Sequence, residues 1–153
     1  MATRFISRRS ALTASIGFAL MPVPAYAKPI AIQVFKDPSC GCCTTWTAKL
    51  KQAGFSVTIN ETSDIRQIKV KYRLPDDLMS CHTGVVGSFA FEGHIPAADI
   101  KRFLKNKRKS LGLAVPGMPI NSPGMEVKGE TNEPYTVWEY YASGLRKPFA
   151  KHS

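Results

Sequence analysis

The sequence has 153 residues, a formal net charge of +10 at pH 7 and 44% hydrophobic side chains. This length is enough for one domain with a core of its own, so no second domain is needed. Much of the positive charge lies in Lys101 to Lys109, at the expected end of a helix, where cations are favoured. Because no nucleic-acid-binding motif accompanies it, we expect no nucleic acid as a partner. Attraction to an anionic membrane surface stays open.

The first 27 residues are typical of an export signal. Three arginines precede an apolar run from Ala11 to Met21, and an A-x-A cleavage site follows at Ala25 to Ala27. The apolar run is about half of the roughly 20 residues that a membrane helix needs, so we expect no transmembrane anchor. We predict a signal peptide at 1–27, which directs export by the general secretory or the twin-arginine route, and a single domain at 28–153.

The segments before residue 80 alternate between strand and helix patterns. Apolar residues alternate with small or polar ones as far as Lys36, and the turn Asp37-Pro38-Ser39 then signals the start of a helix. Gly54 marks the end of the helical pattern that follows this turn, and Pro75 marks the end of the next helical pattern. The predicted elements are a strand at Lys28–Lys36, a helix at Thr44–Ala53, a strand at Phe55–Ile59, a short helix at Ile65–Tyr72 and a helical turn from Pro75.

The second half begins with a β-hairpin pattern from Thr83 to Phe91, turning at Gly87-Ser88. A helix from Pro96 to Lys105 follows, with Ile100, Phe103 and Leu104 on its apolar side. Residues 111–125 are too rich in proline and glycine for a regular element, so we expect an extended loop. Residues 135–141 indicate a last, edge strand followed by a frayed tail. This order predicts an α/β fold with a partly parallel sheet covered by helices.

The cysteines carry the most information about chemistry. Three lie in the run Cys40-Gly41-Cys42-Cys43, where a strand gives way to a helix, and the fourth, Cys81, is followed by His82. The free N–H groups and the positive dipole end of a helix N-terminus favour thiolate over thiol. Cys40 and Cys43 can bridge or hold one metal ion. Two disulfides are the structural alternative, but cysteines this close together gain little from closing a loop, whereas adjacent thiolates can bridge metal ions.

Histidines and methionines extend the candidate ligand set. We expect His94 at the far end of the hairpin from Cys81, and His152 in the tail without a functional role. If the loop that carries Met118 and Met125 folds back over the cysteines, two thioethers join thiolates and imidazole, a set that selects Cu(I). Zinc is the main metal rival, since four cysteine or histidine ligands satisfy it. Hydrolase and kinase motifs are absent from the sequence.

Four motifs identify a family resemblance. Residues 37–43, 80–83, 92–100 and 112–119 resemble, in this order, the CopG-type periplasmic metal-binding proteins, a family long described as a domain of unknown function. The resemblance extends from about Ile30 to Tyr141. It implies a thioredoxin-like fold, which we expect as a mixed sheet of about four to five strands flanked by helices. It also implies copper binding and a role in bacterial copper resistance in the periplasm.

The resemblance also implies which residues form the metal site. The helix-start CxxC of a thioredoxin fold faces the loop that enters the third strand, and here that loop carries Cys81-His82 in place of the usual cis-proline. A soft ligand at this place would complete a metal site. The implied site consists of Cys40, Cys42, Cys43 and Cys81, with His82, His94, Met118 and Met125 as further candidates.

We therefore expect an exported binding protein that takes up copper as Cu(I), with several ions bridged by cysteine sulfurs as one form of the site. A periplasmic copper chaperone or efflux component is the expected exchange partner. The rival hypothesis is a thiol-disulfide oxidoreductase in which Cys40 attacks and Cys43 resolves. In a blend of the two, disulfide formation would expel Cu(I). A third alternative is a disulfide-stapled binding module without chemistry.

Overall fold

The computed structural model describes residues 28–106 and 108–153. The predicted signal peptide lies outside these residues. Within them, none of the helices combines the length and the apolar character that crossing a membrane requires.

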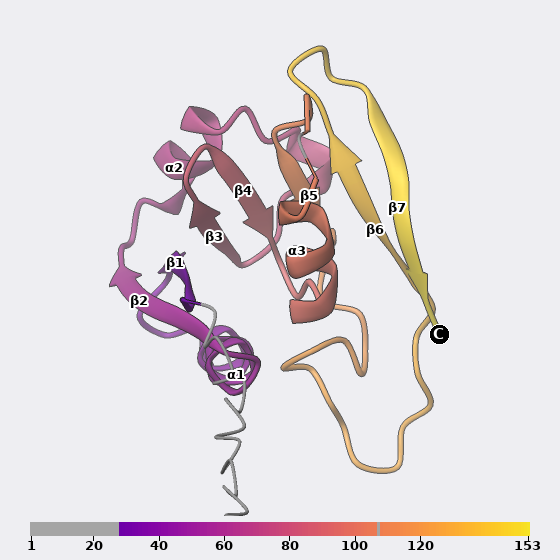
Figure 1. Cartoon of the computed structure of the whole chain (residues 1–153). Helices are drawn as coiled ribbons and strands as arrows, with labels where there is room; N and C mark the ends of the chain where they lie inside the picture. Colours follow the sequence, from indigo (N-terminus) through magenta and orange to yellow (C-terminus); the bar gives the residue numbers. More distant parts are fainter. Residues whose placement is uncertain (1–27, 107) are drawn as a thin grey trace, which may run out of the picture.

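The described residues form one mixed sheet with the strand order β2-β1-β3-β4-β5-β6-β7, in which β2 and β7 are the edges (Figure 1). The strands are β1 (Ile30–Lys36), β2 (Phe55–Glu61), β3 (His82–Val86), β4 (Phe89–Glu92), β5 (Gly112–Ala114), β6 (Tyr135–Tyr140) and β7 (Arg146–His152). The helices are α1 (Gly41–Gln52), α2 (Ile65–Lys71), the 3-10 turn η1 (Asp76–Leu78) and α3 (Ala97–Leu104).

The strand directions bring three chain segments to one end of the sheet. β1 is parallel to β2, a pairing that needs a crossover connection, and α1 supplies it. β3 runs antiparallel to both β1 and β4, with Lys36 opposite His82 and Thr83 opposite Glu92. The end of β1, the start of β3 and the end of β4 therefore meet at the same end of the sheet.

The main hydrophobic core lies between the sheet and helices α1 and α3. It contains Trp46 and Leu50 of α1 together with Ile100 and Phe103 of α3, all of them buried. A second, smaller cluster contains Leu74, Leu78, Ala114 and Tyr140. Successive residues of a strand point to opposite faces, and Leu113 belongs to the main core while Ala114 belongs to the smaller cluster. The two clusters therefore cover opposite faces of the sheet.

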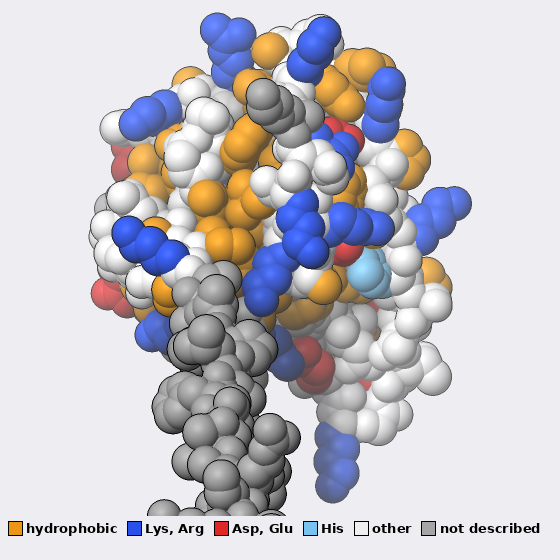
Figure 2. Space-filling model, in the orientation of Figure 1, with side chains coloured by type: hydrophobic (Ala, Val, Ile, Leu, Met, Phe, Trp, Pro, Cys, Tyr) orange, Lys and Arg blue, Asp and Glu red, His pale blue; other side chains and the backbone are white. Residues whose placement is uncertain are grey.

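The surface carries much of the positive charge of the chain. Figure 2 shows lysine and arginine side chains spread over the visible face, with few acidic side chains among them.

The expected mixed α/β fold with flanking helices is confirmed, but the expected four to five strands are too few, because the sheet has seven in the described part of the chain. The segment 111–125 is not free of regular structure, since β5 pairs with β4 and β6. The resemblance to thioredoxin stays a prediction.

The C-terminus also differs from the expectation. β6 is not the edge strand and the last residues are not frayed, because β7 pairs with β6 from Tyr135 opposite His152 to Tyr140 opposite Arg146. His152 lies 2.6 Å from the Asp99 carboxylate through Nε2 and stacks on the Tyr135 ring. These contacts give His152 a structural role in joining β7 to α3.

Candidate metal centre

The turn after β1 places the first cysteine at the start of α1. The carboxylate of Asp37 accepts hydrogen bonds from Ser39, which lower the pKa of Asp37, and the Cys40 N–H donates to the Asp37 carbonyl at 3.1 Å. Cys40 has extended backbone angles and directly precedes α1, which begins at Gly41. The three clustered cysteines therefore lie on the first turn of α1, as the sequence pattern predicts.

The four cysteine sulfurs lie within 4.8 Å of one another. Cys40 and Cys43 form a disulfide, while Cys42 and Cys81 are free thiols. The Cys42 sulfur is 3.5 Å from that of Cys40, and Cys43 is buried. Reduction of the disulfide would therefore give one compact group of four thiols drawn from the start of α1 and the start of β3.

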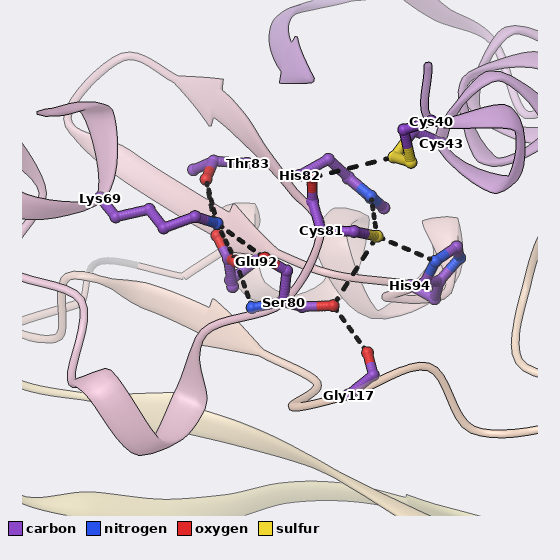
Figure 3. Close-up of polar contacts among 10 residues, drawn as sticks. All are labelled: Cys40, Cys43, Lys69, Ser80, Cys81, His82, Thr83, Glu92, His94 and Gly117. Atoms are coloured by element: carbon purple, nitrogen blue, oxygen red, sulfur yellow. Dashed lines mark hydrogen bonds and ion pairs between the residues drawn. A yellow bond between two sulfur atoms is a disulfide. The ribbon is translucent and has the colours of Figure 1, made fainter. Parts of the chain in front are cut away.

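Cys81 also belongs to a second group, formed with His82 and His94 (Figure 3). Its sulfur lies 3.2 Å from Nδ1 of His82 and 3.4 Å from Nε2 of His94. His94 Nδ1 lies 2.9 Å from the carbonyl oxygen of Pro123. A proton on that Nδ1 leaves the Nε2 lone pair facing Cys81, which is the arrangement of a metal-ligating histidine.

The position of His94 differs from the sequence expectation. The chain after β4 does not lie at the far end of the hairpin from Cys81, because β3 and β4 are antiparallel and the end of the second strand returns to the start of the first. The Gly93 N–H closes this end by donating to the His82 carbonyl at 3.0 Å. The hairpin itself thus brings His94 to Cys81.

Burial determines the protonation of these groups. It raises the pKa of the Cys81 thiol to about 11, with a smaller contribution from the neighbouring Cys42. It lowers the pKa values of His82 and His94, and His82 is fully buried between the rings of Trp46 and His94. The imidazoles are therefore neutral, as metal ligands must be, whereas Cys81 keeps its proton until a metal ion displaces it.

The proline- and glycine-rich loop folds back over the cysteines. The Ser80 hydroxyl donates to the Gly117 carbonyl at 2.6 Å. Gly124 lies against α1 so closely that a Cβ at this position would be 2.9 Å from the backbone nitrogen of Trp46 and 3.1 Å from the carbonyl oxygen of Cys42.

The two methionines of this loop differ in position. The sulfur of Met118 lies 3.9 Å from the Cys42 sulfur, and the side chain is half exposed. Met125 forms a turn, in which its N–H donates to the Ser122 carbonyl and its carbonyl accepts from the Asn121 N–H. Within the described residues, the Met125 sulfur makes no contact with a cysteine sulfur like the one that Met118 makes with Cys42. The structure thus brings together seven of the eight candidate ligands and leaves Met125 outside the group.

Sequence reasoning missed a buried ion pair beside the site. Lys69 of α2 pairs with Glu92 at the end of β4, and both side chains are almost completely buried (Figure 3). Burial raises the pKa of Glu92, while the donors of Lys69, Thr83 and Ser80 act in the opposite direction. The only signal in the sequence is a glutamate at the end of the apolar run Phe89-Ala90-Phe91.

The fold and the site define a class of protein: an α/β domain with a cluster of soft sulfur and nitrogen donors at a helix start. A family described as "Protein of unknown function, DUF411" matches residues 78–125. A comparison with curated proteins gave no match.

Two solved structures resemble the chain over most of its length. "Copper resistance protein copG- Form 1" is 40% identical, with a TM-score of 0.76, over 81% of this chain and 98% of that chain. "Copper resistance protein copG- Form 2" is 41% identical, with a TM-score of 0.77, over 82% of this chain and 99% of that chain. The chain belongs to the CopG family.

Proposed function

We propose that this chain is a periplasmic copper-binding protein that takes up Cu(I) through its cysteine and histidine cluster and contributes to copper resistance. The observation that carries the proposal is the convergence of four cysteine sulfurs within 4.8 Å, with Cys81 shared by a second group that contains His82 and His94. The similar solved structures are named copper resistance proteins, which supports copper as the metal.

The donor set favours Cu(I) over harder cations. Thiolate and thioether sulfurs are soft ligands that select Cu(I), and the half-exposed Met118 adds a thioether beside Cys42. Zinc would be satisfied by four cysteine or histidine ligands and would gain nothing from a methionine. Because one cysteine sulfur can bridge ions, a site with several copper ions is part of the proposal.

The proposal includes export and an exchange partner. The signal pattern at 1–27 supports delivery of a single domain, 28–153, to the periplasm. A copper chaperone or efflux component would exchange the metal, and Met118 is the most exposed candidate ligand through which such an exchange could begin.

Substitution of ligands tests the proposal by copper stoichiometry. Cys81→Ser removes the residue shared by both groups and should lower the number of copper ions bound per chain. The Met118→Leu, Met125→Leu pair should lower it as well, and because only Met118 contacts a cysteine, Met118→Leu should account for the loss. Met125→Leu alone serves as the matched control. Full copper loading by all of these variants would contradict the proposed site.

The Cys40–Cys43 disulfide supports a second candidate function, a thiol-disulfide oxidoreductase. In that case Cys40 would attack a substrate disulfide and Cys43 would resolve the mixed disulfide. Activity towards a model disulfide should then be lost in Cys40→Ser and Cys43→Ser but kept in Met118→Leu. The opposite pattern, copper loading that depends on Met118 without disulfide turnover, would leave copper binding as the function.

A further inference from the structure

The segment that carries Cys81 lies outside the regular pairing of the sheet. β3 begins at His82, and its pairing with β4 begins with Thr83 opposite Glu92. The residues just before β3 therefore need other contacts to fix the Cys81 sulfur between two imidazoles.

The Glu92 carboxylate makes two of these contacts. One oxygen accepts the Ser80 N–H at 2.6 Å and also pairs with the Lys69 ammonium, while the other accepts the Thr83 hydroxyl at 2.6 Å. Ser80 and Thr83 flank the Cys81-His82 dipeptide on its two sides. Glu92 thus holds the backbone of the residue immediately before the two candidate ligands and the side chain of the residue immediately after them.

Lys69 makes two more of these contacts. Its ammonium donates to the Ser80 carbonyl at 3.0 Å and to the Thr83 hydroxyl at 3.3 Å. The backbone N–H and carbonyl of Ser80 are therefore both hydrogen-bonded to the ion pair. In Figure 3, Lys69 and His94 lie on opposite sides of Cys81. From the other direction, the Ser80 hydroxyl is bonded to Gly117.

We infer that the buried Lys69–Glu92 pair positions the Cys81-His82 segment for metal binding, an inference that rests on the proposed function. Removing two charges from water is costly, and an apolar pair of similar size would fill this space at less cost. What an apolar pair cannot supply is the set of hydrogen bonds that fixes Ser80. Groups that orient metal ligands typically change the affinity for the metal by about 10- to 100-fold when they are replaced.

Two double variants separate positioning from simple stability. Lys69→Met, Glu92→Leu removes the charges and both hydrogen bonds between the ion pair and the Ser80 backbone. Lys69→Met, Glu92→Gln removes the charges as well but keeps one acceptor oxygen for the Ser80 N–H, while the amide NH2 group of the glutamine can donate to the Thr83 hydroxyl oxygen. The matched control is Arg108→Met, Glu139→Gln, which removes a partly buried ion pair between the segment after α3 and β6 that has no described hydrogen bond to the cysteines.

The first readout is Cu(I) affinity, measured by competition of the reduced protein with a chromophoric Cu(I) chelator. The second readout is the alkylation rate of Cys81. It is measured on metal-free protein that carries Cys42→Ser and keeps the Cys40–Cys43 disulfide, so that Cys81 is its free thiol. We expect the Leu variant to bind Cu(I) about 10- to 100-fold more weakly than wild type. We also expect its Cys81 to be alkylated faster. The Gln variant and the control should stay closer to wild type, and the thermal midpoints show how far each variant is destabilised.

The inference is overturned if the Leu variant matches wild type in both readouts. It is also overturned if losses follow the thermal midpoints in all variants, the control included, because the pair would then only stabilise the fold. Failure of wild type itself to load Cu(I) would overturn the proposed function instead. The alkylation rates would in that case still decide whether the pair positions Cys81.

Discussion

The raised pKa of Cys81 predicts how copper affinity depends on pH. A pKa of about 11 keeps this thiol protonated from about pH 7 to 9, so a metal ion that binds its sulfur must release one proton. The association constant should then gain about a factor of ten per pH unit from this residue, or about 1.4 kcal/mol. His82 and His94 add no slope, because their lowered pKa values make them neutral over this range. Affinity therefore rises with pH.

The perturbation that isolates this contribution is Cys81→Ser. The logarithm of the Cu(I) association constant of the reduced protein is measured against pH by chelator competition, for wild type and variant under the same conditions. The remaining cysteines contribute to both proteins, so the difference in slope belongs to Cys81. The slope of the variant should be smaller by about one unit per pH unit. Equal slopes would refute the reasoning, because Cys81 would then either be ionised before binding or not bind the metal.

Three further results are expected. Gly93→Ala should lower the free energy of unfolding by about 2–4 kcal/mol in a urea titration, because φ is 75° and the new Cβ would meet the Val115 carbonyl and lie 2.9 Å from the Ser80 Cβ; wild-type stability would contradict this. Trp46→Phe should cost about 1–3 kcal/mol in the same titration, since it removes the donor at 2.9 Å from the buried Ile95 carbonyl. Cu(I) at about 100 times its dissociation constant should stabilise the reduced protein by about 2.7 kcal/mol, and an unchanged thermal midpoint would show that the metal does not bind the folded state preferentially.

The part of the fold that the sequence predicts is the part with strong local patterns. Apolar alternation up to Lys36 and from Phe55, with a helical pattern between them, is enough to predict β1, α1 and β2. The Gly87-Ser88 turn likewise predicts the β3–β4 hairpin. The four cysteines lie in these elements or directly before them, and the family resemblance implied that Cys81 would face the helix-start cysteines.

The missed strands lack such patterns. β5 has only three residues, and its place in the sheet depends on pairing with β4 and β6 rather than on its own composition. β7 contains Pro148 and three basic residues, which conceal its alternation, and the register shifts between Val137 and Trp138 opposite this strand. Propensity cannot predict strands that exist mainly through their neighbours.

The structure brings together seven of the eight candidate ligands, but the sequence did not predict how all of them meet. The approach of His94 to Cys81 follows from antiparallel pairing, which a one-dimensional pattern does not display. The Lys69–Glu92 pair joins residues that are 23 positions apart, so neither sequence segment reveals the partner of its charge. The separation of Met118 from Met125 likewise depends on the path of one loop.

The most direct test of the account is the metal content of the mature protein, reduced and loaded with Cu(I) under anaerobic conditions, with a parallel count of reactive thiols and a zinc-loaded control. The account predicts more than one copper ion per chain, with the four cysteines protected from alkylation. Little bound copper, together with ready cycling of Cys40 and Cys43 between thiol and disulfide, would contradict it and leave a thiol-disulfide oxidoreductase as the function.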